Sequence, residues 1–200
     1  VCMSALVAAG AAGQAMAQDS TQSYIEDIVV TAQKREENLQ AVPLSVSAFS
    51  ARGLENRQAY DLRAISGQVP SLVVTNVVNV QTTAAVSIRG IGVQEADPFI
   101  DPAVGVVLDG VFQGTNTTAL LDLFDIERIE ILRGPQGTLF GTNTIGGVIN
   151  VVTKQPTGEF GGTARVTAGN FGRLDVMGSI DFPIIEDVLA GKVTGMFKSF

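Results

Sequence analysis

The 200-residue chain is acidic and glycine-rich, with 13 basic and 20 acidic residues, a net charge of −7, 22 glycines, no histidine and one cysteine, Cys2. A negative charge of this size argues against a nucleic-acid partner, which normally requires a basic surface. There is no histidine, and Cys2 lies in a segment that we expect to be removed, so a zinc site, a thiol nucleophile and a histidine base are all unavailable. An enzyme would be left with carboxylate or hydroxyl chemistry only.

The first 17 residues have the pattern of an export signal. A run of small apolar residues at 5–12 is followed by Ala15-Met16-Ala17, an A-x-A cleavage pattern, so we expect the mature chain to begin at Gln18. The alternative is a short core helix. No other run approaches the ~18 apolar residues of a membrane-spanning helix.

A short extended segment follows a polar stretch. Its residues, Asp27-Ile28-Val29-Val30-Thr31-Ala32, are rich in the types that favour an extended chain. Because polar residues flank it on both sides, it has no obvious core partner of its own. Such a segment can add as a strand to the edge of another protein's sheet through main-chain hydrogen bonds. The alternative is an ordinary first strand of the domain that follows.

Residues 39–155 have the pattern of a small mixed α+β domain. Pro43 excludes a helix, residues 44–49 alternate as a half-buried strand, and Ser50 can cap a helix over 51–57. A second helix places Ala59, Leu62 and Ile65 on one face and ends at Gly67 and Pro70. Short strands are expected at 72–75, 84–89, 104–108, 126–132 and 148–153, with a helical turn at 117–124 and polar, turn-rich connections.

The densest motif runs from a charged strand at 126–133 through a glycine turn into an apolar strand ending near Lys154. The glycines imply positive φ angles or close approach to another surface, and stand at positions 134, 137, 141, 146 and 147. A phosphate loop is excluded because Gly147 and Val148 occupy the positions of its Lys and Ser or Thr. A dinucleotide fingerprint starting at Gly90 fails because Glu95 replaces its third glycine. On composition alone the run is a turn-rich antiparallel scaffold.

From residue 160 to residue 200 the pattern changes to strict alternation of apolar and polar residues. Three stretches, separated by turns at 169–172 and 183–187, each present one apolar and one polar face. Stretches of about 10 residues with this alternation are typical of transmembrane barrel strands. A soluble sandwich gives the same alternation.

Residues 126–154 closely resemble the plug domain of TonB-dependent outer-membrane receptors, whose plugs carry an E-R-I-E-V-L-R-G-P-x-G-x-L-Y-G…G-G-x-I-N-x-V-T-K run. Phe140, Thr142 and Thr144 are modest departures from that pattern. The entry at 39–50 and the extended segment at 27–32 resemble the plug entry and the TonB box of the same family. The resemblance implies an α+β plug domain followed by the first antiparallel strands of a transmembrane β-barrel. A barrel that holds a plug has about 22 strands, so we expect this chain to be truncated, with an incomplete signal at its start and most of the barrel beyond Phe200.

The resemblance also implies where function resides. Plug loops that face the exterior would meet the substrate, and plug arginines would pair with carboxylates of the barrel wall. The matching arginines are Arg89 and Arg133, for which strand-end solvation is the alternative. The loop positions are Asn79, Gln81, Gln94, Glu95, Asp97, Phe99, Asp101, Gln113 and Asn116, with Asn76, Phe112 and Thr117 beside them. Glu95, Asp97 and Asp101 also have oxygen ligands at short spacing, which a hard cation would accept, although solvated carboxylates are the commoner case.

We therefore expect a non-enzymatic outer-membrane receptor that takes up a scarce nutrient, with a ferric siderophore as the commonest cargo of the family and an oligosaccharide or cobalamin as alternatives. The expected partners are TonB with its inner-membrane energising complex, outer-membrane lipid and the substrate, without a resident cofactor, metal or nucleic acid. One rival is a secreted all-β binding module, which would leave the 28–32 segment without a partner. The other is a periplasmic hydrolase, for which no pair of converging carboxylates is evident.

Overall fold

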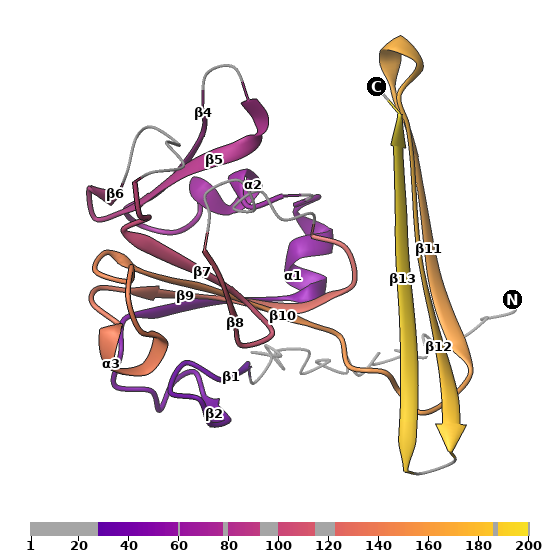
Figure 1. Ribbon diagram of the computed structural model, residues 1–200, viewed down its shortest axis with the longest axis horizontal. Coiled ribbons are helices and arrows are strands. Elements are labelled where there is room, and N and C mark those ends of the chain that lie inside the picture. The colour runs from indigo at the N-terminus through magenta and orange to yellow at the C-terminus, as the bar shows by residue number, and fades with distance from the viewer. Residues whose placement is uncertain are drawn as a thin grey trace, which may run out of the picture.

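The computed structural model describes residues 28–59, 61–77, 80–92, 100–114, 123–185 and 188–199. The strands form four sheets, of which three belong to a mixed α+β unit and the fourth is a separate antiparallel sheet beside it (Figure 1). The expected export signal, Asp27 and most of the expected helical turn at 117–124 lie outside the described residues. Within the described ranges, no helix is long and apolar enough to span a membrane.

A five-stranded sheet in the order β3-β9-β10-β7-β8 forms the centre of the α+β unit. Its central strands β9 and β10 are antiparallel, and β10 runs parallel to β7. The strand bounds are β3 Val46–Ser50, β7 Val104–Leu108, β8 Val111–Gln113, β9 Ile126–Arg133 and β10 Gly147–Thr153. Strands β3, β7, β9 and β10 confirm the predicted ones within two residues at each end, whereas β8 was not predicted.

Both faces of this sheet are covered. One face carries Ile129, Ile131 and Ile149 into the main core, together with side chains from helices α1 (Ala51–Asn56) and α2 (Arg63–Ser66) and from the smaller sheet β4-β5-β6. Ala59, Leu62 and Ile65 are all buried, as expected. The expected helix through them is wrong, because α2 spans only Arg63–Ser66 and contains just one of the three, Ile65. The smaller sheet comprises β4 Leu72–Val77, β5 Val80–Ile88 and β6 Ile91–Gly92, and it lies at the opposite end of the unit from β1 and β2 (Figure 1).

The predicted cap of the first helix is present: the Ser50 hydroxyl accepts a hydrogen bond from the Gly53 amide at 3.3 Å. We expect Ser50→Ala to lower the free energy of unfolding of the α+β unit by about 1 kcal/mol, the usual effect of removing an N-cap. Chemical denaturation of the full-length protein measures this difference. Ser50→Asp keeps an acceptor at the cap and should remain within a few tenths of a kcal/mol of the parent. A loss as large for aspartate as for alanine would contradict the role of the cap.

The glycine turn before β10 is fixed by backbone contact. Gly147 has a φ of +148°, and a Cβ at this position would lie 2.3 Å from the Leu132 carbonyl oxygen. A side chain here would collide with the neighbouring strand, so only glycine allows β10 to begin beside β9. Gly137 does not meet the expectation, because it starts helix α3 (Gly137–Phe140) with open space around its Cβ position.

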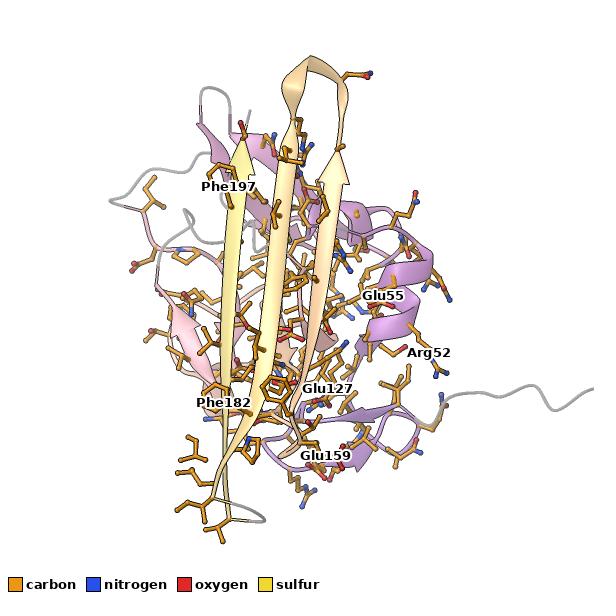
Figure 2. All side chains as sticks on the ribbon, turned by 90° about the vertical axis from the view of Figure 1, so that its right-hand side faces the viewer. Arg52, Glu55, Glu127, Glu159, Phe182 and Phe197 are labelled. Atoms are coloured by element: carbon orange, nitrogen blue, oxygen red, sulfur yellow. The ribbon has the colours of Figure 1, made fainter. Side chains whose placement is uncertain are left out.

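The separate sheet consists of β11 Gly161–Ala168, β12 Leu174–Ile185 and β13 Leu189–Ser199, paired in sequence order. Its alternation is inverted relative to a water-soluble protein. The polar Asp175 and Ser179 of β12 are buried, whereas Val166, Val193 and Phe197 are more than half exposed. Figure 2 views this sheet from the side opposite the α+β unit, with Phe197 and Phe182 near its two ends.

The expected break at Pro183 is wrong, because β12 continues to Ile185. Proline lacks the amide that a ladder between two neighbours needs, and it is tolerated where a strand has a partner on one side only. The pairing of β12 with β11 ends at Asp181, so Pro183 faces only β13, where the register also shifts.

Candidate functional site

The extended N-terminal segment forms strand β1 (Val29–Val30), which pairs antiparallel with β2 (Glu37–Asn38). The tight connection between them is closed by the Lys34 amide, which donates to the Thr31 carbonyl at 2.8 Å. The Leu39 amide donates to the Ile28 carbonyl at 3.0 Å and extends the pairing by one residue. The segment is therefore a short hairpin rather than a free extended chain.

This hairpin packs on the second face of the five-stranded sheet, in an apolar group that we call the N-terminal cluster. The side chains of Val30 and Ala32 are fully buried there, whereas that of Val29 is 43% exposed. The expectation that the segment has no core partner is therefore wrong. The buried members of the cluster are Val30, Ala32, Val42, Val107, Leu132 and Val148.

A fully buried carboxylate, that of Glu130 on the central strand β9, ties the hairpin to the sheet. Its Oε1 accepts hydrogen bonds from the Thr31 amide at 2.7 Å, from the Thr31 hydroxyl at 3.1 Å and from Arg128 Nε at 2.8 Å. Its Oε2 accepts from Asn150 Nδ2 at 3.1 Å, and Asn150 is its register neighbour on β10. A buried charge persists only when it is paired and hydrogen-bonded, and both conditions are met here.

The partners of Glu130 come from distant parts of the sequence, and sequence reasoning missed them. The alternation of β9 contained the signal: Arg128, Glu130 and Leu132 share one face, while Ile129 and Ile131 share the other. A strand that carries charges and a leucine on one face and isoleucines on the other indicates that both faces are covered. The sequence did not reveal that the cover is the N-terminal hairpin.

One further contact joins the hairpin to α3: Lys34 Nζ lies 5.8 Å from the centre of the Phe140 ring, a cation–π geometry. Within the hairpin itself, Arg35 Nε lies 2.5 Å from Glu37 Oε1. While the hairpin is docked, Val30 is already paired with Glu37, so addition of β1 to another sheet requires this hairpin to open.

Of the expected exterior loop positions, the structure describes few. Asp101 is exposed, and Gln113 is half-buried on β8, where its Nε2 donates to the Val111 carbonyl at 3.3 Å. Phe112 packs against the N-terminal cluster, so its expected place in an exterior loop is wrong. The side chain of Gln81 and the positions Asn79, Gln94, Glu95, Asp97, Phe99, Asn116 and Thr117 lie outside the described residues.

Asn76, at the end of β4, is held by a charged pair. Its Oδ1 accepts from Arg63 Nη1 at 3.0 Å, and Arg63 Nε donates to the Asp61 carboxylate at 2.7 Å. Burial raises the pKa of Asp61, but the hydrogen bond and charge of Arg63, with the amides of Arg63 and Ala64, outweigh it and hold the pKa below its usual value. Asp61 therefore stays ionised at neutral pH and keeps Arg63 directed toward the strand.

Of the two arginines expected to face a wall, Arg89 directly follows β5 and its side chain reaches the backbone beside Arg133, the last residue of β9. A Cβ placed on Gly134, directly after Arg133, would lie 3.5 Å from Arg89 Nη1. Arg133 Nε is buried and has no hydrogen-bond partner among the residues that the structure describes. Over the same residues, no group of three or more His, Cys, Asp or Glu side chains could hold a metal ion.

Comparison with known proteins identifies this architecture. Residues 38–148 match the family of the TonB-dependent Receptor Plug Domain. The chain is 31% identical over 180 residues to the pesticin receptor of Yersinia pestis, covering 90% of this chain and 26% of that protein. It is 33% identical over 165 residues to the iron-regulated outer membrane virulence protein of Vibrio cholerae serotype O1, covering 76% of this chain and 24% of that protein.

The solved structures give the same result. The ferric yersiniabactin uptake receptor FyuA from Yersinia pestis superposes with a TM-score of 0.66 at 32% identity, covering 76% of this chain and 24% of that one. The chain thus spans about a quarter of the length of these relatives. On the strength of the family match over more than half of its residues, the chain belongs to the TonB-dependent receptor plug domain family.

Proposed function

We propose that the protein is an outer-membrane receptor for energised uptake of a ferric siderophore, and that the α+β unit is its plug. The observation that carries the proposal is the family match together with the docked hairpin that contains Ile28–Ala32. The two relatives and the solved receptor named above are a pesticin receptor, an iron-regulated outer membrane protein and a ferric yersiniabactin uptake receptor. The association of two of these three with iron supports a ferric chelate as the substrate class.

In this proposal the Asp27–Ala32 segment is the TonB box. Substrate binds the exterior end of the plug, where we place the nine positions from Asn79 to Asn116 named above, although Gln81 lies on β5 and Gln113 on β8. The plug then shifts. The hairpin then leaves the N-terminal cluster, and β1 adds as a strand to TonB, which the inner-membrane complex energises. The pull remodels the plug and opens a path. The position of β4-β5-β6 at the opposite end from β1 and β2 supports this division between a substrate end and a coupling end (Figure 1).

The three-stranded sheet β11–β13 is the start of the receptor's wall in this proposal. Its exposed apolar side chains, with Asp175 and Ser179 buried on the other face, suit a sheet that has lipid on the outside and a polar plug on the inside. A secreted all-β binding module is disfavoured, because it would leave these side chains in water and Ile28–Ala32 without a role. The outer membrane is therefore the proposed location, with the N-terminus in the periplasm.

Arg89 and Arg133 are proposed to hold the plug against carboxylates of the wall. The buried Arg133 Nε without a partner among the described residues supports an acceptor supplied by another part of the receptor. An Arg fork binds a carboxylate through two parallel hydrogen bonds, and such a pair is stronger when partly desolvated.

Binding measurements on the purified full-length protein test the substrate class. We expect saturable binding of at least one ferric chelate, drawn from a panel that includes ferric yersiniabactin, catecholates and hydroxamates, and no comparable binding of the iron-free chelators. The change in intrinsic fluorescence on titration is a suitable readout. Tight binding of cobalamin or an oligosaccharide with no binding of any ferric chelate would replace this substrate with one of the alternatives.

A further inference from the structure

One corner of the plug, at Phe124–Asp125, contacts the first wall strands through two cations. Lys192 Nζ on β13 lies 2.5 Å from Asp125 Oδ2, and their side chains are 14% and 8% exposed. The Arg165 guanidinium on β11 lies 5.6 Å from the centre of the Phe124 ring, whose residue is buried. The two contacts come from different wall strands and converge on neighbouring residues.

The same lysine also reaches the backbone of the connection between plug and wall. Lys192 Nζ donates to the Lys154 carbonyl at 3.0 Å, and the Lys154 amide donates to the Asp125 carbonyl at 2.9 Å. Lys154 directly follows β10, the last strand of the plug, and β11 begins at Gly161. Lys192 therefore fastens the plug corner and the start of the connection at one point.

A second carboxylate faces Lys192 from its own sheet. Asp181 is the register neighbour of Lys192 on β12, and its Oδ1 lies 3.8 Å from Lys192 Nζ. This distance is longer than the one to Asp125, and Asp181 Oδ1 has no hydrogen-bond partner in the described part of the chain. Lys192 therefore pairs mainly with Asp125. Removing one partner of a buried or nearly buried ion pair costs far more stability than removing one partner of an exposed pair.

Beside this contact lies a cavity of about 110 Å³ between the plug and β11. Its lining includes Ala59, Glu55 and Leu54 of the plug and Arg165 of the wall. Figure 2 shows Glu55 on α1, beside the edge of the wall sheet. Asp125 and Lys154 also line this cavity, so the Asp125–Lys192 contact lies at its edge.

We infer that the Asp125–Lys192 pair clamps this corner of the plug to the first wall strands, so that the corner stays in place while the N-terminal hairpin is pulled. The statement that the corner stays in place during the pull rests on the proposed uptake function, whereas the clamp itself does not. The pair has the opposite polarity to the contacts proposed for Arg89 and Arg133, since here the plug supplies the anion and the wall the cation. It also lies next to the covalent connection, where a fixed point limits how much of the plug can move.

A thiol reporter in the cavity tests the clamp in the purified full-length receptor. Ala59→Cys, in a receptor whose other cysteines are replaced, adds a single sulfur atom that the adjacent cavity can accept, at a position that is 5% exposed. We expect Asp125→Asn and Lys192→Met each to raise its rate of alkylation roughly tenfold, because the uncompensated partner favours an opened interface. Lys192→Met leaves the plug unchanged, so it keeps the test usable if Asp125→Asn lowers the yield of folded receptor.

Two matched variants separate the clamp from a general loss of charge. Lys192→Arg keeps the cation and should label at the parental rate. Asp181→Asn removes the wall's own carboxylate but keeps the clamp, and it should also label at the parental rate. Parental rates in both Asp125→Asn and Lys192→Met, or a rate in Asp181→Asn as high as theirs, would overturn the clamp. Alkylation of the purified receptor needs no transport, so it tests the clamp even if the proposed uptake function is wrong.

The same Ala59→Cys reporter in energised cells supplied with substrate tests whether the corner stays in place. We expect the introduced thiol to remain protected during uptake when Asp125 is intact, and to be labelled when Asp125→Asn is added. Equal, rapid labelling with and without Asp125→Asn during uptake would show that the corner moves with the pulled segment. That result would overturn the inference that the corner stays in place.

Discussion

Replacing Glu130 by alanine is expected to lower the free energy of unfolding of the plug by roughly 3–5 kcal/mol, the usual loss when one partner of a buried charged pair is removed. Arg128, whose side chain is 12% exposed, would lose its buried partner, and the Thr31 amide and Asn150 Nδ2 would lose an acceptor. The N-terminal hairpin should detach first, because Thr31 is its polar link to the sheet. Denaturant unfolding of the full-length protein gives the free energy, and hydrogen exchange at Thr31 gives the detachment.

Glu127 provides a matched control on the same strand. Its side chain is 45% exposed and pairs with the same arginine at the surface, so Glu127→Ala should change the unfolding free energy by no more than about 1 kcal/mol. Glu130→Gln should fall between the two. Glutamine keeps the acceptor at Thr31 but presents an amide donor to Asn150 Nδ2, so the side-chain amide of Asn150 must flip. Equal unfolding midpoints for Glu130→Ala and Glu127→Ala would show that the buried Glu130 network does not stabilise the plug.

Val30→Pro in the full-length receptor is expected to abolish energised uptake while leaving surface binding of the substrate nearly intact. Proline removes the amide and fixes φ near −65°, which can cost about 3 kcal/mol, or roughly 100-fold in affinity for a partner that pairs with this strand. Val30 is also fully buried in the N-terminal cluster, so proline detaches the hairpin in the resting receptor as well. Uptake and surface binding of a radiolabelled ferric chelate, measured on the same cells, separate the two steps.

Val30→Ala distinguishes detachment from loss of pairing. It removes two buried methyl groups and weakens docking, but it keeps the amide that a partner strand needs, so uptake should fall far less than with proline. A Val30→Pro receptor that transports at the parental rate, or one that loses substrate binding together with uptake, would show that Ile28–Ala32 is not the coupling strand.

Features that depend on neighbouring residues could be predicted from the sequence. The Ser50 cap, the burial of Ala59, Leu62 and Ile65, and strand β7 at Val104–Leu108 are all as expected, because each depends on residues within a few positions. The alternation of the wall strands was equally local. Proline in β12 was misjudged, because its tolerance depends on β11 ending earlier, which no residue near Pro183 reveals.

The docked state of the N-terminal hairpin could not be predicted, because its partners lie far away in the sequence. The hydrogen bond between Thr31 and Glu130 joins residues 99 positions apart, and the bond between Thr31 and Asn150 joins residues 119 positions apart. Composition showed an extended, partly apolar segment, but nothing local indicated which face it would cover. The same holds for the Asp125–Lys192 contact, which joins the α+β unit to the sheet β11–β13 across 67 positions of sequence.

Accumulation of a radiolabelled ferric chelate by cells tests the central claim most directly. The cells should lack other receptors for that chelate and express the full-length protein, and uptake should be followed with and without an agent that collapses the proton gradient. The account predicts accumulation far above the surface-bound amount, which falls to the surface-bound level without the gradient and also in Val30→Pro with the gradient present. Equal accumulation with and without the gradient, or in the parent and Val30→Pro, would contradict energised coupling through the N-terminal hairpin.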